Sequence, residues 1–129
     1  MSSLNRPLSG ALLTFTLDEH LAELRRDEAY TRSGRAGRTL AKSGRLRVVL
    51  VALAEGCIIG TQQADSPMTV QVLQGHIRFR AEDAEHELHQ GQLLFFGPGD
   101  ANDIRATEET ALLLSLSAAG DDYRMTNDE

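Results

Sequence analysis

Residues 72–80 read Val-Leu-Gln-Gly-His-Ile-Arg-Phe-Arg, and residues 87–96 read Glu-Leu-His-Gln-Gly-Gln-Leu-Leu-Phe-Phe. In each stretch a glycine separates two short runs that contain apolar and aromatic residues, which is the pattern of a turn between β-strands. After Gly75, Ile77 and Phe79 fall on one face of the expected strand and the polar residues fall on the other. These stretches therefore predict consecutive short strands with one face in a core.

The same pattern extends over most of the chain after residue 38. Further turns are expected at Gly56 and at Gly97-Pro98-Gly99. The expected strands are residues 39–42, 46–53, 68–73, 76–81, 85–89, 93–96, 103–107 and 111–117. Eight strands at this spacing predict an all-β barrel or sandwich. Strands and helices do not alternate, which excludes a doubly wound nucleotide-binding fold.

One short N-terminal helix is expected over residues 16–30. Three leucines recur there at helical spacing: Leu17, Leu21 and Leu24. Thr16 and Glu19 stand at the positions of a capping box. Residues 10–15 before the helix are expected to form a strand, which either pairs at a sheet edge or reaches toward a partner subunit.

Length and charge limit the possible functions. With 129 residues and a formal net charge of −6, the chain fits one domain and lacks the excess of positive charge that a nucleic-acid-binding protein needs. No apolar stretch approaches the ~20 residues that span a bilayer, and no leader opens the chain. A single cysteine, Cys57, suits a reducing compartment. We therefore expect a cytoplasmic protein that binds neither nucleic acid nor membranes.

The order of these turns and strands resembles the conserved β-barrel of the cupin superfamily. The segments that carry the resemblance are Leu53-Ala-Glu-Gly56, residues 72–79, residues 87–96, Gly97-Pro-Gly99 and Ala111-Leu-Leu-Leu114. The resemblance implies a jelly-roll barrel, also called a double-stranded β-helix. The organisation that follows is an N-terminal arm and helix over residues 1–37, a barrel over 38–118, and an acidic, flexible tail over 119–129.

The metal-binding residues of that family are missing here. In cupins three histidines and a glutamate at fixed distances from the motif glycines hold the metal. The corresponding positions in this sequence hold Gln62, Ala64, Met68 and Asn102. Two amides, an alanine and a thioether supply neither the affinity nor the negative charge that a transition metal needs. His86 and His89 fall on opposite faces of a strand and cannot chelate together. We therefore expect no metal and no cofactor.

A polar set remains at the end where a cupin barrel opens. The candidate pocket residues are Gln62, Gln63, Met68, Gln71 if it faces inward, His86 and Asn102. Amides both donate and accept hydrogen bonds, so this set favours a small polar ligand. The sequence is equally compatible with a barrel filled by its own side chains.

Three functions follow from these observations. The first is a homodimeric cupin module that binds a small molecule or acts in regulation, with no catalytic residue assigned. The second is a metal-independent isomerase or epimerase, for which His86 is the one plausible acid or base. The third is a structural dimer without a ligand, in which pairing covers the edges of the sheets.

Overall fold

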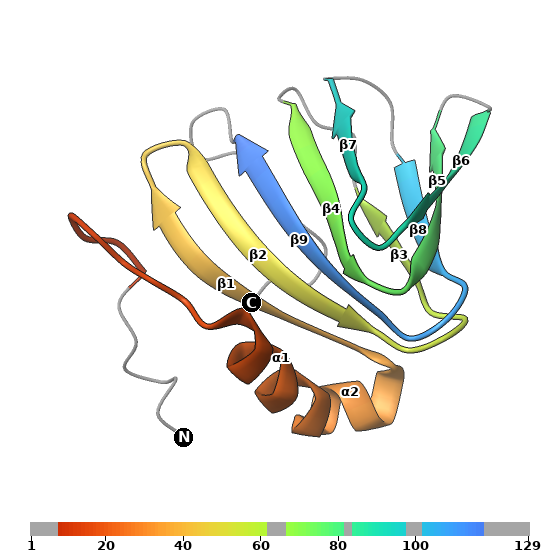
Figure 1. Ribbon diagram of the computed structural model, residues 1–129, viewed down its shortest axis with the longest axis horizontal. Coiled ribbons are helices and arrows are strands. Elements are labelled where there is room, and N and C mark those ends of the chain that lie inside the picture. The colour runs from red at the N-terminus through yellow and green to blue at the C-terminus, as the bar shows by residue number, and fades with distance from the viewer. Residues whose placement is uncertain (1–7, 62–66, 82–83, 98–101, 118–129) are drawn as a thin grey trace.

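A computed structural model of the chain describes residues 8–61, 67–81, 84–97 and 102–117. Within these residues, antiparallel strands form two sheets (Figure 1). The strands are β1 (Arg35–Ser43), β2 (Leu46–Leu53), β3 (Ile58–Thr61), β4 (Met68–Gln74), β5 (His76–Ala81), β6 (Ala84–His89), β7 (Leu93–Phe96), β8 (Asn102–Ala106) and β9 (Thr110–Ser117). One sheet has the order β1-β2-β9-β4-β7 and the other has the order β3-β8-β5-β6. This arrangement confirms the predicted jelly-roll fold.

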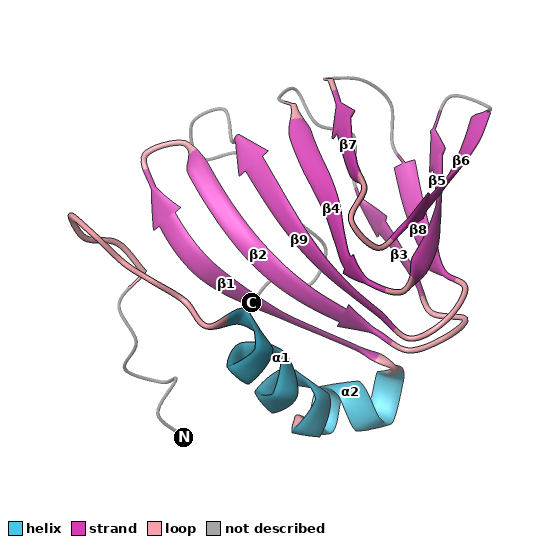
Figure 2. Cartoon of the chain, in the orientation of Figure 1, coloured by secondary structure: helices cyan, strands magenta, loops and turns pink. Residues whose placement is uncertain are grey.

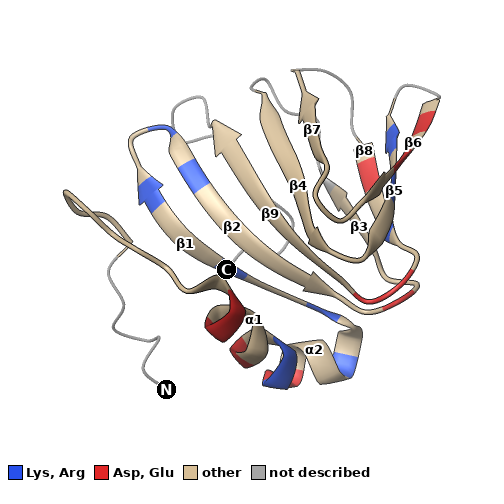
Figure 3. Cartoon of the chain, viewed as in Figure 1, with Lys and Arg blue, Asp and Glu red and all other residues tan. Residues whose placement is uncertain are grey.

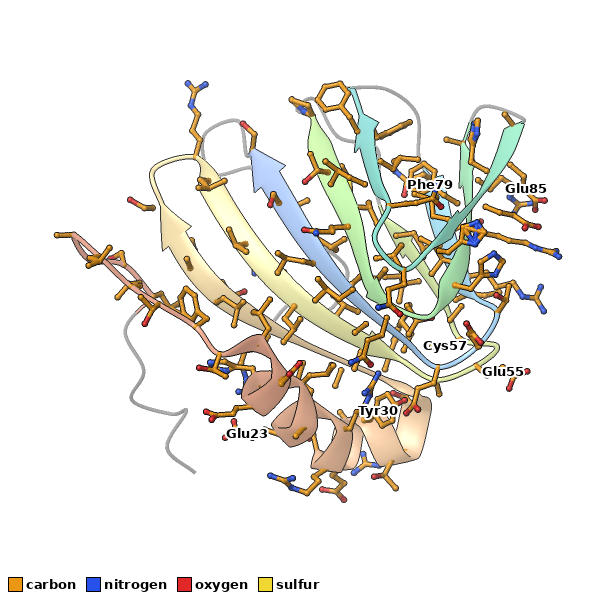
Figure 4. All side chains as sticks on the ribbon, in the orientation of Figure 1. Glu23, Tyr30, Glu55, Cys57, Phe79 and Glu85 are labelled. Carbon is orange, nitrogen blue, oxygen red and sulfur yellow. The ribbon has the colours of Figure 1, made fainter. Side chains whose placement is uncertain are left out.

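Strand alternation places the main core between the two sheets. Along β4, Met68, Val70 and Val72 are buried and the residues between them are partly exposed. The same alternation on β5 buries Ile77 and Phe79, as the sequence predicts. Phe79 makes an edge-to-face contact with Phe96, with ring centroids 5.5 Å apart, and Figure 4 shows it between the sheets. Such pairs add about 0.5–1.5 kcal/mol beyond the burial of their area.

A second apolar layer lies on the outer face of the five-stranded sheet. Helix α1 (Leu17–Arg26) buries Leu21 and Leu24 there, against Leu40 of β1 and Leu50 of β2. Figure 2 shows both helices beside β1 and β2. Within the described part of the chain, no helix has the length and apolar character needed to cross a bilayer.

The helical region differs from the prediction of one helix over residues 16–30. The chain breaks at Asp27, whose backbone is extended, and helix α2 (Glu28–Ser33) follows. The Asp27 carboxylate accepts a hydrogen bond from the amide of Ala29 at 3.0 Å and so caps α2. Thr16 makes no side-chain cap, so the predicted capping box does not form. Two short helices thus replace the one continuous helix that was predicted.

The strand predictions hold with three exceptions. Strands β2, β5 and β7 have the predicted bounds, whereas β1 begins at Arg35 instead of residue 39. Strand β3, which was not predicted, pairs with β8. Residues 10–15 form no strand, although the carbonyl of Leu8 accepts a hydrogen bond from the amide of Lys42 at 2.8 Å. The N-terminal arm therefore touches the β1 edge without extending the sheet.

Candidate functional site

Among the described residues, one end of the barrel carries several polar side chains that point inward. At this end the strand register places Arg47 opposite Leu116, and Leu116 opposite Met68. Met68 in turn lies opposite Phe96 on β7. These four side chains therefore form one level across the inner face of the five-stranded sheet. Asn102, the first residue of β8, lies at the same end on the facing sheet, because β7 ends at Phe96 and the chain returns through β8.

Arg47 brings a permanent positive charge to this level. It shares the inward face of β2 with Val49 and Val51, and its side chain is half-buried. Its Nη2 donates a hydrogen bond to Oγ1 of Thr39 on the neighbouring strand, at 3.2 Å. The guanidinium is thus held in place by β1.

The levels deeper in the barrel are apolar. The inward side chains there, all less than a tenth exposed, are Val49, Val51, Leu53, Ile59, Val70, Val72, Ile77, Phe79, Leu88, Ile104, Ala106, Leu112 and Leu114. Packing of this kind leaves the middle of the barrel filled. Among the described residues, the inward polar side chains Arg47, Thr39 and Asn102 thus lie at one end of this apolar interior.

The structure brings together only part of the predicted pocket. Met68 and Asn102 both point inward at this end, with exposed fractions of 4% and 8%. Gln62 and Gln63 lie outside the described residues. Gln71 was included on the condition that it faces inward. It alternates with the buried Val70 and Val72 and so faces outward, and the condition is not met.

His86 takes an intermediate position. It lies opposite Phe79 in the register, which places it on the inward face of β6, as the sequence predicts. It is nevertheless exposed, because β6 is the last strand of its sheet. His89 lies opposite His76 on the other face, with ring centroids 5.0 Å apart, so His86 and His89 do not converge.

The side chains at the cupin ligand positions do not fit a metal. Met68 offers a thioether and Asn102 a neutral amide, where the family has carboxylate and imidazole donors. In the described ranges, no group of three or more His, Cys, Asp or Glu residues lies close enough together to hold a metal ion. No metal-dependent reaction is therefore assigned to this site.

Arg47 and Thr39 were missed by the sequence analysis. The run Arg47-Val-Val-Leu-Val-Ala-Leu53 is apolar at nearly every position, which hides the alternation of faces. The sequence did carry one signal, because side chains alternate along a strand and Arg47 lies on the same face as Val49 and Val51. Using that signal required knowing which face of β2 points into the barrel.

The opposite end of the barrel carries polar groups that hold the fold together. The fully buried Thr110 accepts a hydrogen bond at Oγ1 from the amide of His76, at 3.2 Å. The hydroxyl of Tyr30, a residue of α2 labelled in Figure 4, donates to Oε2 of Glu109 at 3.1 Å. Partial burial and this hydrogen bond to Glu109 raise the pKa of Tyr30. These contacts fix helix α2 and the turns, and we assign them no further chemistry.

Comparisons with known proteins agree with this architecture. No protein-family model matches the sequence, and no curated protein is significantly similar to it. Among solved structures, a cupin superfamily protein from Desulfitobacterium hafniense has a TM-score of 0.63 and 18% identity, over 66% of this chain and 78% of that one. A conserved protein of unknown function from Streptococcus pyogenes has a TM-score of 0.65 and 18% identity, over 89% of this chain and 93% of that one.

A regulatory protein contains a similar barrel. The cupin-2 domain of an XRE family transcriptional regulator from Enterobacter cloacae has a TM-score of 0.61 and 12% identity, over 67% of this chain and 98% of that one. Identities this low establish the fold and leave the activity open. The protein described here therefore has the cupin fold.

Proposed function

We propose that this protein is a cupin module without a metal site that binds a small polar molecule at the open end of its barrel. The observation that carries the proposal is the placement of Arg47, Thr39 and Asn102 on inward positions above an otherwise apolar interior. A few polar side chains that point into a largely apolar barrel are typical of the groups that orient a ligand, so their collection at one end favours a binding role there.

The side chains define the chemistry of the ligand. Arg47 is a permanent cation whose donors match a carboxylate or phosphate, and Asn102 can both donate and accept. Met68 and Phe96 supply an apolar wall beside them. These groups suit a small molecule that combines an anionic or strongly accepting group with a short apolar part.

A regulatory role in the cytoplasm completes the proposal. The similar barrel in a transcriptional regulator supports regulation as one use of the fold. Cys57 as the single cysteine suits a reducing compartment. We assign binding to the barrel over residues 38–118, with residues 1–37 as an arm and residues 119–129 as an acidic tail.

The experiment is a thermal-shift screen with carboxylates, phosphates, sugars and neutral polar compounds. A ligand at about 100 times its Kd stabilises the folded state by about 2.7 kcal/mol, which raises the unfolding midpoint by several degrees. We expect the shift to be lost in Arg47→Ala and Asn102→Ala. It should persist in Arg105→Ala, a matched control whose exposed side chain lies on the outer face of β8.

Two results would reject the binding proposal. One is a screen in which no compound stabilises the wild type. The other is a ligand whose shift survives Arg47→Ala and Asn102→Ala.

We also propose that the module is a homodimer. Strand β7 is the edge of its sheet, and exposed apolar edge strands promote aggregation unless another chain covers them. If no compound binds and the protein forms a stable dimer, a structural role is the remaining function.

A further inference from the structure

Two histidines lie side by side on the outer face of the four-stranded sheet. The register pairs His76, the first residue of β5, with His89, the last residue of β6. Their ring centroids are 5.0 Å apart, and the ring planes are inclined by 41°. Ile77 and Leu88, the neighbours of the two histidines along the chain, are buried in the core, so both imidazoles lie on the opposite, outer face.

Glu87 brings a carboxylate to the same place. It lies two residues before His89 on β6 and therefore on the same face of the sheet. Its Oε1 is 3.5 Å from Nε2 of His76, and its Oε2 is 3.5 Å from Nε of Arg78. Figure 3 shows the same arrangement of charge, with basic residues on β5 beside acidic residues on β6. Arg78 thus holds one carboxylate oxygen and leaves the other facing His76.

The hydrogen bonds of the other ring nitrogen determine what Nε2 of His76 can do. Nδ1 of His76 lies 2.6 Å from Oγ1 of Thr107. The Thr107 hydroxyl donates its one proton to the backbone carbonyl of His76, at 3.1 Å, so Oγ1 accepts from Nδ1–H. In the neutral imidazole, Nε2 then carries a lone pair, and this lone pair is directed toward Glu87.

The spacing of these groups fits a metal ion between them. Zinc binds imidazole nitrogen and carboxylate oxygen at about 2.0–2.2 Å, so two such donors at a tetrahedral angle lie about 3.4 Å apart. Nε2 of His76 and Oε1 of Glu87 are 3.5 Å apart, whereas a direct charged hydrogen bond between them would measure about 2.7–2.9 Å. Two imidazoles on one tetrahedral ion have centroids about 5 Å apart, which is also the separation of His76 and His89.

We infer that His76 and Glu87 bind a divalent transition-metal ion such as Zn²⁺ on the outer face of this sheet, with His89 turning onto the ion as a third ligand. Imidazole favours zinc, nickel and copper over magnesium and calcium. Metal-binding histidines commonly donate their second ring N–H to a fixed acceptor, which is the role of Thr107 here. The net charge of −6 adds a general attraction for cations.

The site is built for exchangeable binding. In the part of the chain that the structure describes, no three such side chains converge closely enough to hold an ion as they stand. His76 and Glu87 are therefore the two donors already in place, and the exposed side chain of His89 has to rotate toward the ion. An ion held in this way is lost to a chelator during purification, unlike a resident metal with three or four fixed ligands.

The test is calorimetric titration of zinc into untagged, chelator-treated, full-length protein, with magnesium as the control ion. We expect one zinc per chain and no magnesium. His76→Ala, His89→Ala and Glu87→Gln should each raise the dissociation constant about 10-fold or more, because loss of a ligand costs at least as much as loss of its supporting hydrogen bond. His86→Ala is the matched control, since His86 lies on the same strand with its side chain on the other face.

A second measurement follows the imidazole nitrogens by ¹⁵N NMR. Zinc should shift the Nε2 resonance of His76 while Nδ1 remains protonated. Thr107→Val removes the acceptor for Nδ1–H and should weaken zinc binding about 10–100-fold, whereas Thr107→Ser keeps the hydroxyl and should restore it. Circular dichroism and a cooperative thermal transition must show that each variant is folded.

The outcomes separate this site from the barrel end. A wild type that binds no zinc at any concentration that keeps the protein in solution overturns the inference. Zinc binding that survives both His76→Ala and Glu87→Gln, or that weakens equally in His86→Ala, overturns the assigned residues. Arg47→Ala, which tests the proposed ligand site, should leave the zinc affinity unchanged, so failure of one proposal is distinguished from failure of the other.

Discussion

Replacing Gly75 by alanine should destabilise the barrel more than the same replacement at Gly91. Both glycines have a left-handed backbone, with φ of 93° and 91°. They differ in what surrounds them. A Cβ at Gly75 would lie 2.8 Å from Cα of Thr110 and would also collide with the carbonyl oxygen of Glu109 and with Oγ1 of Thr110. A Cβ at Gly91 would have no atom within 4 Å.

The expected magnitudes follow from this difference. A left-handed alanine costs about 1–2 kcal/mol at either position. At Gly75 the contacted atoms belong largely to backbone, which cannot rotate away, and overpacking adds about 1–3 kcal/mol. The displaced Thr110 hydroxyl is also the acceptor for the amide of His76. We therefore expect a loss of about 1–2 kcal/mol for Gly91→Ala and about 2–5 kcal/mol for Gly75→Ala.

Urea denaturation followed by circular dichroism measures both free energies of unfolding. The two variants should keep the slope of the wild type and differ in their midpoints. Equal losses at Gly75 and Gly91 would show that backbone strain alone acts at both positions. In that case the close approach of the β4–β5 turn to Thr110 would not contribute to stability.

Three further predictions concern other parts of the molecule. Thr110→Val removes the acceptor of the His76 amide inside the protein and should cost about 1–3 kcal/mol in chemical denaturation, whereas an unchanged midpoint would contradict the role of this hydrogen bond. The raised pKa of Tyr30 adds stability that is present below pH 10.0 and lost as pH rises through the folded-state pKa. Thermal midpoints should therefore fall more steeply above pH 10.0 in the wild type than in Tyr30→Phe, and parallel curves would oppose the contribution of Tyr30. Elemental analysis of untagged protein should find no stoichiometric transition metal, and a near-stoichiometric metal would overturn our assignment of the Met68 and Asn102 end.

The sequence predicts the strands best where alternation and glycine turns coincide. Residues 76–81 have both signals, and β5 has those bounds. Strand β3 was missed because its four residues, Ile58–Thr61, include a glycine and show no alternation. The predicted helix was extended across Asp27 although the leucine spacing ends at Leu24. The Asp27 carboxylate caps a second helix instead.

The candidate site was harder to predict because faces depend on pairing. Gln71 lies between two buried valines, and only the inward direction of those valines shows that it points out. Arg47 was overlooked because the register with Leu116 is needed to place it inside. Phe95 gave no signal of exposure, since a run of four apolar residues is equally typical of a fully buried strand.

The glycines that carried the resemblance to cupins have a different physical role from the metal ligands that this sequence lacks. Gly56, Gly75 and Gly91 all have a positive φ, between 87° and 93°, which turns between strands require whether or not the barrel performs chemistry. The side chains at the metal-ligand positions Met68 and Asn102 stand at one end of the barrel, where Met68 belongs to the same core cluster as Phe79. For this reason the glycine framework identifies the fold, and the function has to be argued from side chains such as those at the Arg47 and Asn102 end.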